Sequence, residues 1–294
     1  QTIEHFEILK LLKIKYGFII LNKIDLVDED WINLVENDIK DFSKGSFLDN
    51  CEIIRASSIK EIGIKKIHKK IEEIYNLIPN RKISGIFRMH IDRVFSKTGF
   101  GCVVTGTVGA GCVAVGDILE LLPSNQKVKV RSIQSHGNNV DTAYSGERAA
   151  INLNNTESNK LKRGYHLSKI NTFAEIDSFI SEILLNKSKK TKIQNNQRIR
   201  IHLGTREVMG RVSIIRINNQ NNESKIPALI KLETPIVAGI GDHFIIRSFS
   251  PVYTIGGGKI INVPKKESWK VLKDKIIDLH ELSDKERLYK IINN

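Results

Sequence analysis

The chain has 294 residues, 40% of them apolar, so it can bury the cores of two or three domains and is not a disordered chain. It carries 46 Lys and Arg against 33 Asp and Glu, which gives a formal net charge of +13. Because the cations recur along the whole chain, they favour a polyanionic partner such as a nucleic acid, although a solvated basic surface would have the same composition.

The cysteines and the hydropathy pattern exclude two classes of protein. Cys51, Cys102 and Cys112 have neither CxxC spacing nor a nearby histidine pattern, so we predict no zinc or other metal site and no disulfide framework. No apolar run approaches the ~18 residues that cross a bilayer. The N-terminus also lacks the pattern of a secretory signal. We therefore expect a soluble cytoplasmic protein with no membrane partner.

The first 80 residues alternate between helical and strand patterns. Apolar spacing predicts helices over 2–14, 29–42 and 64–78, the last of them ended by Pro79. Between the helices, the apolar runs "YGFIILN" and "CEIIRA" predict two parallel strands buried on both faces. The order helix, strand, helix, strand, helix is typical of half of a doubly wound α/β domain.

From about residue 85 the pattern changes to short β-rich segments separated by glycine, in one series up to residue 170 and in a second over 173–264. Short strands at this spacing predict two β-barrels. The polar tracts "NKSKKTKIQNNQ" and "NNQNNESK" fall between strands of the second series, so we expect them to be exposed hairpin loops. Residues 265–294 have a helical period and are rich in charge.

The segment Asn22-Lys23-Ile24-Asp25 follows the first predicted strand and has the form of a guanine-binding motif. Guanine presents an N1–H beside an amino group, and the carboxylate of Asp25 could accept from both; adenine would leave that carboxylate facing a lone pair. Asn22 would tie the loop, and the aliphatic stem of Lys23 would lie along the base. The motif is short, and the same letters also occur in ordinary turns.

A second motif, "ASSIKEIGI", follows the second predicted strand. Ser57 and Ser58 occupy the two small positions of a loop whose backbone N–H would reach guanine O6. Small residues suit this loop because the backbone itself must approach the base. Two such motifs, each after a strand, predict a guanine site at the carboxyl edge of a parallel sheet. Turns and helix caps are the structural alternative.

The phosphate half of such a site is missing from the sequence. Neither a GxxxxGK[ST] loop nor the Asp-x-x-Gly element that would meet Mg²⁺ and the γ-phosphate occurs, and only 21 residues precede Asn22. We therefore expect the chain to be a fragment whose intact form carries the phosphate loop and the Mg²⁺ ligands. A degenerate, nucleotide-free domain is the competing interpretation.

The β-rich part resembles known translation factors. The run from Ile91 to His136, which contains "VVTGT" and "IQSH", resembles the second domain of elongation factor Tu and related translational GTPases. The run from Arg247 to Val263 resembles the end of their third domain. These motifs, the triple glycine at 256–258 and the helical extension after it are most similar to the selenocysteine-specific elongation factors, and the likeness covers nearly the whole chain.

This resemblance implies a fold that is α/β plus all-β. Residues 1–80 would be the C-terminal part of a P-loop GTPase domain, and 85–170 and 173–264 would be β-barrels of the elongation-factor type, the first on the aminoacyl-tRNA side. Residues 265–294 would then be the short helical start of a winged-helix extension.

The resemblance also implies a function for the intact factor. It would bind GTP or GDP with Mg²⁺, act as a GTPase, and deliver selenocysteinyl-tRNA to the ribosome at UGA codons beside an mRNA hairpin, which the missing extension would read. We expect a monomer. The chain alone should not hydrolyse GTP, and no catalytic residue is assigned, since neither His5 nor His136 follows an Asp-x-x-Gly segment.

In the family, an aminoacyl pocket on the second domain uses an Asp-Arg pair early in its first strand and an arginine near the end of the barrel. The matching residues are Asp92, Arg93 and Arg148. A selenol ionises more readily than a thiol or hydroxyl, so two guanidiniums would favour it over serine or cysteine. For either arginine alone, a surface cation or a cross-strand ion pair is the alternative.

Two other functions fit parts of the same pattern. Another tRNA-delivering GTPase, of the elongation factor Tu or initiation factor type, would treat seryl- and selenocysteinyl-tRNA alike. A non-enzymatic RNA-binding module of basic barrels would bind tRNA in a salt-dependent way, whatever amino acid is attached.

Overall fold

The computed structural model describes residues 1–79, 85–97, 101–154, 156, 161–186, 192–215, 225–264, 267–283, 285–287 and 290 of the chain. The chain divides into two compact units, Gln1–Asn80 and Arg81–Asn294. Gly99, residues 187–191 of the first polar tract and residues 218–224 of the second lie outside the described residues.

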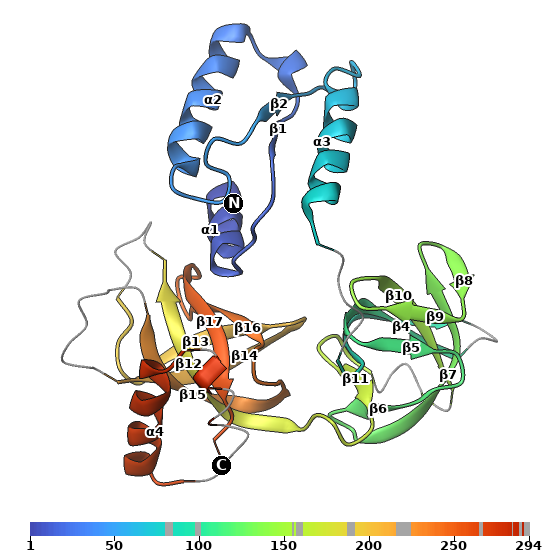
Figure 1. The fold of residues 1–294 in the computed structure, drawn as a ribbon, viewed down its shortest axis with the longest axis vertical. Coiled ribbons are helices and arrows are strands. Elements are labelled where there is room, and N and C mark those ends of the chain that lie inside the picture. Colours follow the sequence, from blue (N-terminus) through green and yellow to red (C-terminus); the bar gives the residue numbers. More distant parts are fainter. Residues whose placement is uncertain are drawn as a thin grey trace. The chain divides into compact units, whose positions relative to one another are not determined.

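The first unit has the predicted order of elements, and Figure 1 shows α2 and α3 on either side of the strand pair. The strands β1 and β2 are parallel, with Ile20 opposite Ile54. The elements are α1 (Thr2–Leu11), β1 (Ile19–Leu21), a 3-10 turn (Ile24–Leu26), α2 (Glu29–Ser43), β2 (Ile53–Arg55) and α3 (Ile64–Leu77).

Local sequence explains where these helices lie. The side chain of Asp28 caps α2 by accepting a hydrogen bond of 2.8 Å from the Trp31 amide. On α1, Phe6 is buried and its ring lies 4.6 Å from that of Phe42, so an aromatic contact holds α1 against α2.

One part of the strand prediction is wrong. Ile54 on β2 is 2% exposed, but Ile20 on β1 is 44% exposed, so β1 is not buried on both faces. Among the described residues β1 has a single neighbouring strand, and its side chains keep the solvent access that strands inside a wider sheet lose.

The first barrel confirms the prediction for the β-rich series up to residue 170. Six antiparallel strands run in the order β10-β4-β3-β11-β6-β7, the pairing of β10 with β7 closes the ring, and β8 is added beside β7. Its core includes Met89, Ile91, Val104, Ile151 and Leu167, all fully buried. The strands are β3 (Arg88–Lys97), β4 (Gly101–Ala110), β5 (Cys112–Ala114), β6 (Ile118–Leu122), β7 (Gln126–Ser135), β8 (Asn138–Val140), β9 (Thr142–Tyr144), β10 (Arg148–Asn154) and β11 (His166–Lys169).

The second barrel is closed in the order β12-β15-β14-β13-β16-β17 around the rings of Phe179 and Phe244, whose centroids are 5.0 Å apart. The triple glycine lies on β17, where a Cβ at Gly256 or Gly258 would come within 2.3 Å of a neighbouring carbonyl oxygen, so these positions need glycine. The strands are β12 (Glu175–Leu185), β13 (Gln197–Leu203), β14 (Arg206–Ile214), β15 (Ile226–Val237), β16 (His243–Ser248) and β17 (Thr254–Asn262).

The predicted terminal helix is α4 (Trp269–Glu281), which lies beside the second barrel in Figure 1. Leu272 and Ile276 of α4 pack with Ile180 and Leu229 of β12 and β15 in a separate small core. The helix is therefore an integral part of the barrel's outer face in this unit.

Candidate guanine and aminoacyl sites

The two guanine-type motifs leave β1 and β2 at the same edge of the strand pair. The amide of Ala56 donates to the Leu21 carbonyl at 2.9 Å, and the amide of Ile24 donates to the Ala56 carbonyl at 3.3 Å. These two bonds join the two loops directly. The predicted convergence at the carboxyl ends of parallel strands is therefore present.

The first loop presents Asp25 to solvent. Lys23 has a φ of +65°, and its amide donates to the Asn22 side-chain oxygen at 2.9 Å, which fixes the turn. Asp25 is exposed, and among the described residues its carboxylate has no hydrogen-bond partner in this structure. A planar donor pair such as the guanine edge would meet an unused acceptor here.

The second loop is held by its own backbone. Ser57 is fully buried and exchanges main-chain hydrogen bonds of 3.1 and 3.0 Å with Ile62, while its hydroxyl accepts from the Lys60 amide at 3.1 Å. Ser58, beside it, is exposed. The loop ends at Gly63, whose φ is +78° and where a Cβ would lie 2.2 Å from the Arg55 carbonyl oxygen.

Arg55 is a bracing residue that sequence reasoning missed. Its guanidinium, at the end of β2, donates to Glu36 at 2.6 Å, to Asn33 at 2.7 Å and to Glu29, all on α2. The hydrogen bond from Arg55 lowers the pKa of the Glu36 carboxyl. An arginine at the end of an apolar strand is the signal that could have indicated this bridge.

On the first barrel, the structure brings Asp92 and Arg148 together. Arg148 donates to the two carboxylate oxygens of Asp92 at 2.6 and 3.1 Å, across the intervening strand β4. The hydroxyl of Thr105, on β4, donates to the same carboxylate at 2.7 Å. Asp92 therefore has three hydrogen bonds that fix its orientation.

Burial raises the pKa of the Asp92 carboxyl, but the hydrogen bonds from Arg148 and Thr105 and the charges of Arg148 and Arg93 outweigh it. The net result is a lowered pKa. Asp92 is therefore ionised at neutral pH, and with the two arginines it leaves one net positive charge on this patch.

Arg93 lies on the same outer face but outside this ion pair. It is paired in register with Thr105 on β4, and on the other side of Thr105 the register partner is Ala150 of β10. Arg148 is the register partner of Thr107, two residues further along β4. Among the described residues Arg93 has no hydrogen-bond or ion-pair partner, so its guanidinium is available to a ligand.

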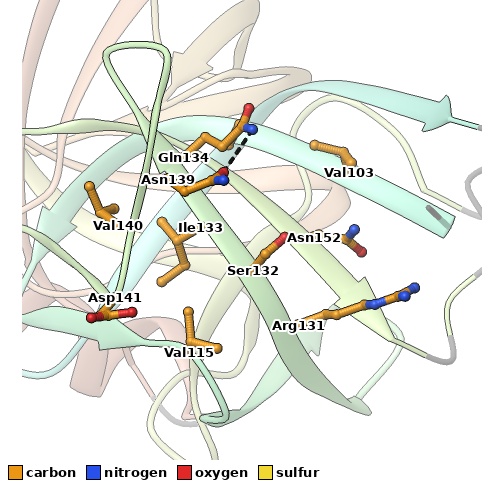
Figure 2. A pocket seen from close by; sticks show the side chains of 11 residues that line it. Val103, Val115, Arg131, Ser132, Ile133, Gln134, Asn139, Val140, Asp141 and Asn152 are labelled. Atoms are coloured by element: carbon orange, nitrogen blue, oxygen red, sulfur yellow. Dashed lines mark hydrogen bonds between the residues drawn. The ribbon is translucent and has the colours of Figure 1, made fainter.

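A pocket of about 750 Å³ continues this row across the barrel. Ala150 of the row lines it, and so does its next register partner, Gln134 on β7. Gln134 donates to Asn139 at 3.0 Å, and Figure 2 shows this pair with Ser132 and Asn152 among the side chains that line the pocket. Sequence reasoning missed these residues, although the outward-facing polar positions of β7 were a readable signal.

The described part of the chain contains no cluster of three or more His, Cys, Asp or Glu residues that could hold a metal ion. None of its helices is long and apolar enough to span a membrane.

Models of two protein families match the barrels. Residues 101–168 match elongation factor Tu domain 2, and residues 180–267 match the β-barrel domain of the selenocysteine-specific elongation factor. An α/β unit with guanine-type loops, followed by these two barrels, defines a translation factor of the elongation factor Tu class.

Relatives and solved structures agree with this class. The chain is 33% identical to the selenocysteine-specific elongation factor of Desulfomicrobium baculatum over 89% of its own length and 41% of that protein. It is 31% identical to the apicoplast elongation factor Tu of Plasmodium falciparum, over 90% of this chain and 72% of that one. The chain thus spans less than half of the first of these relatives.

The crystal structure of a bacterial selenocysteine-specific elongation factor matches with a TM-score of 0.84 and 26% identity, over 98% of this chain and 47% of that one. The elongation factor of Methanococcus maripaludis in complex with the GTP analogue GppNHp matches with a TM-score of 0.82 and 25% identity, over 92% and 64%. The chain belongs to the elongation factor Tu family. Within it, the chain is similar to the selenocysteine-specific elongation factors in its second barrel, its sequence and its fold.

Proposed function

We propose that the intact protein delivers selenocysteinyl-tRNA to the ribosome at recoded UGA codons, and that the patch of Asp92, Arg93 and Arg148 receives the selenocysteine side chain. The observation that carries this proposal is the register of the first barrel. It places two guanidiniums on one outer face, on either side of β4, with one net positive charge between them. A selenolate is a monoanion of matching charge, whereas a seryl hydroxyl is neutral.

The adjoining pocket supports the same proposal. The amino acid of an aminoacyl-tRNA is esterified to the terminal ribose, so the terminal nucleoside must lie next to whatever holds the side chain. The pocket of about 750 Å³ shares the row of Thr105 and Ala150 with Arg93, and Gln134 and Asn139 offer amide groups to a base edge. We assign the terminal nucleoside to this pocket.

GTP is the proposed cofactor, in the intact protein and with Mg²⁺. Asn22, Lys23, Asp25, Ser57 and Ser58 form the proposed guanine site, and the two loops that carry them are hydrogen-bonded to each other. The Methanococcus maripaludis relative was crystallised with a GTP analogue, which supports nucleotide binding. Since no GxxxxGK[ST] loop occurs among the 294 residues, we propose that this chain alone does not hydrolyse GTP.

The remaining assignments follow from the family. Residues 1–80 would belong to the GTP-binding domain, 85–170 to the barrel on the aminoacyl side and 173–264 to the other barrel. The segment 265–294 would begin an extension that reads an mRNA hairpin. We propose that the intact factor acts as a monomer in the cytoplasm and meets the ribosome there.

The test compares two aminoacyl-tRNAs in the intact protein. Arg148→Ala should weaken selenocysteinyl-tRNA binding by about tenfold or more, since a hydrogen bond to a charged group is lost, and should weaken seryl-tRNA far less. Arg198→Ala is the matched control, because Arg198 also forms a two-bond pair with a carboxylate, Glu233, but on the second barrel. The control should change both affinities by the same factor.

A second function is favoured by one specific observation. Arg148 already has a carboxylate partner in Asp92, as a purely structural cross-strand ion pair would. If that is its whole role, the protein handles selenocysteinyl- and seryl-tRNA alike, as another tRNA-delivering GTPase would. Equal losses of both ligands in Arg148→Ala would establish this alternative and remove the selenocysteine pocket.

A further inference from the structure

A two-residue turn of the second barrel, Gly204-Thr205 between β13 and β14, touches the first barrel at three points. The Thr205 hydroxyl donates to the Ile91 carbonyl at 2.7 Å, and the Thr205 carbonyl accepts from Arg163 at 3.1 Å. At Gly204 a Cβ would lie 2.6 Å from the His90 ring, so only glycine lets the turn come this close. We call these two residues the inter-barrel turn.

The contacted carbonyl belongs to the peptide that leads into Asp92. On β3 the register shifts between Ile91, opposite Gly106, and Arg93, opposite Thr105, so Asp92 is the extra residue of a β-bulge. A bulge changes the direction in which side chains point. This bulge places the side chains of Asp92 and Arg93, which are adjacent in the chain, together on the proposed aminoacyl face. The Ile91–Asp92 peptide therefore sets the backbone position from which both side chains leave the strand.

Ile91 is also held from within the first barrel. Its carbonyl accepts from the Gly164 amide at 3.0 Å, and its amide, in the preceding peptide, donates to the Tyr165 carbonyl at 2.9 Å. The Thr205 hydroxyl is the contribution of the second barrel to this carbonyl. A tilt of the turn would thus be transmitted to the bulge within one peptide unit.

We propose that Thr205 is a positioning residue for the aminoacyl site, through which the second barrel fixes the bulge that presents Asp92 and Arg93. The inference rests on the proposed function of that site. It assigns to a residue on the other barrel an influence on which amino acid side chain is accepted. Nucleic acid bound on the second barrel would then affect the selectivity of the first.

The first measurement does not depend on the proposed function. In the 294-residue chain, Thr205→Val should make the amides of residues 91–94 exchange with solvent roughly fivefold faster, the factor that corresponds to one net hydrogen bond. Thr205→Ser keeps the hydroxyl and should restore the original rates. Thr142→Val, on β9, is a matched control that should leave these rates unchanged.

The second measurement is the preference of the intact protein for selenocysteinyl- over seryl-tRNA. Thr205→Val should reduce that ratio several-fold, Thr205→Ser should restore it, and Thr142→Val should leave it unchanged. A general loss of structure would weaken both ligands and leave the ratio as it was. The ratio therefore separates positioning from mere stabilisation.

Each outcome decides something. Unchanged exchange at residues 91–94 in Thr205→Val would overturn the inference, and so would faster exchange with an unaltered preference ratio. If the parent protein showed no preference between the two tRNAs, the proposed function would fail. Faster exchange of the bulge in Thr205→Val would then still support the structural coupling between the barrels.

Discussion

Arg88 of the first barrel and Asp242 of the second form an ion pair at 2.6 Å, with side chains only 17% and 13% exposed. The guanidinium also stacks over the Phe173 ring and lies 3.3 Å from Nε2 of His90, whose ring meets that of His166 at 4.5 Å. Burial lowers the pKa of His90 to about 4; the charge of Arg88 adds to this shift and that of Asp242 opposes it. The pKa of His166 is lowered as well, mainly by burial and further by the charges of His90 and Arg88.

These shifts predict that the barrel pair loses stability in mild acid. Both histidines are neutral in the folded chain but have the ordinary pKa of 6.5 in the unfolded chain. Above pH 6.5 they therefore impose no penalty on the free energy of unfolding, and below it that free energy decreases as the pH falls toward 4. For His90 the loss at pH 5 is on the order of 2 kcal/mol. Urea unfolding of His90→Gln at pH 7 and pH 5 should show a smaller acid penalty than the parent chain. His68→Gln, on the exposed face of α3, is the control and should keep the parental penalty. The same pH dependence in His90→Gln and the parent would contradict the argument.

The docking of α4 is predicted to depend on Glu182. This carboxylate on β12 accepts from His280 at 2.8 Å and from Arg287, which is 7% exposed, and pairs with Lys225 at 3.3 Å. Removing the carboxylate takes a counter-charge from a buried guanidinium, which typically costs about 3 kcal/mol or more. Glu182→Gln should therefore expose α4 to proteolysis and fast amide exchange. Glu233→Gln, at the solvent-screened pair with Arg198, should destabilise the chain far less and leave α4 protected.

The same carboxylate gives this docking a pH limit. Burial raises the pKa of Glu182, but the hydrogen bond and charge of Arg287, together with Lys225 and His280, lower it below 4.5 overall. The stabilisation is therefore complete above pH 4.5 and disappears as the pH falls through the lowered value. Protection of α4 that persisted unchanged in Glu182→Gln would show that the apolar contacts of Leu272 and Ile276 suffice.

Gly63 is predicted to be irreplaceable in the first unit. Gly63→Ala would place a Cβ 2.2 Å from the Arg55 carbonyl oxygen and would strain a φ of +78°, so we expect a loss of about 3 kcal/mol or more in the free energy of unfolding. Gly45→Ala is the matched control, because its φ is +68° but nothing lies within 4 Å, and it should lose only about 1 kcal/mol. Urea unfolding followed at the amides of β1 and β2 gives both values. Equal losses would mean that backbone strain, and not the clash, decides.

The sequence predicted the elements well wherever the periodicity was long. The helices, the parallel pair and most barrel strands follow from apolar spacing and glycine punctuation, since these record which face of an element is buried. The sequence pattern missed β11, because four residues with three polar side chains carry no readable period, although β11 joins β3 to β6 and is required to close the first barrel.

The candidate sites were predictable only in part. Motifs placed Asp25 and Ser57 on adjacent loops because parallel strands end at a common edge. The bond from Thr105 to Asp92, the bulge at Asp92 and the turn at Thr205 depend on register and on contacts between barrels, which a single strand's pattern does not encode. The exposure of Ile20 likewise depends on which strands are neighbours.

The last prediction concerns the base that the exposed Asp25 selects. In the intact protein, Asp25→Asn should lower the affinity for GDP about a hundredfold, because a carboxylate that accepts from two adjacent donors is replaced by an amide that repels one of them. The same variant should gain affinity for xanthosine diphosphate, whose ring carries an oxygen where guanine carries its amino group. Asp28→Asn is the matched control: Asp28 lies three residues away and caps α2, asparagine caps helices as well as aspartate does, and the guanosine preference should persist. Titration with labelled GDP and labelled xanthosine diphosphate measures both affinities in the parent protein and in each variant. A variant Asp25→Asn that still preferred GDP would show that the carboxylate does not meet the guanine edge.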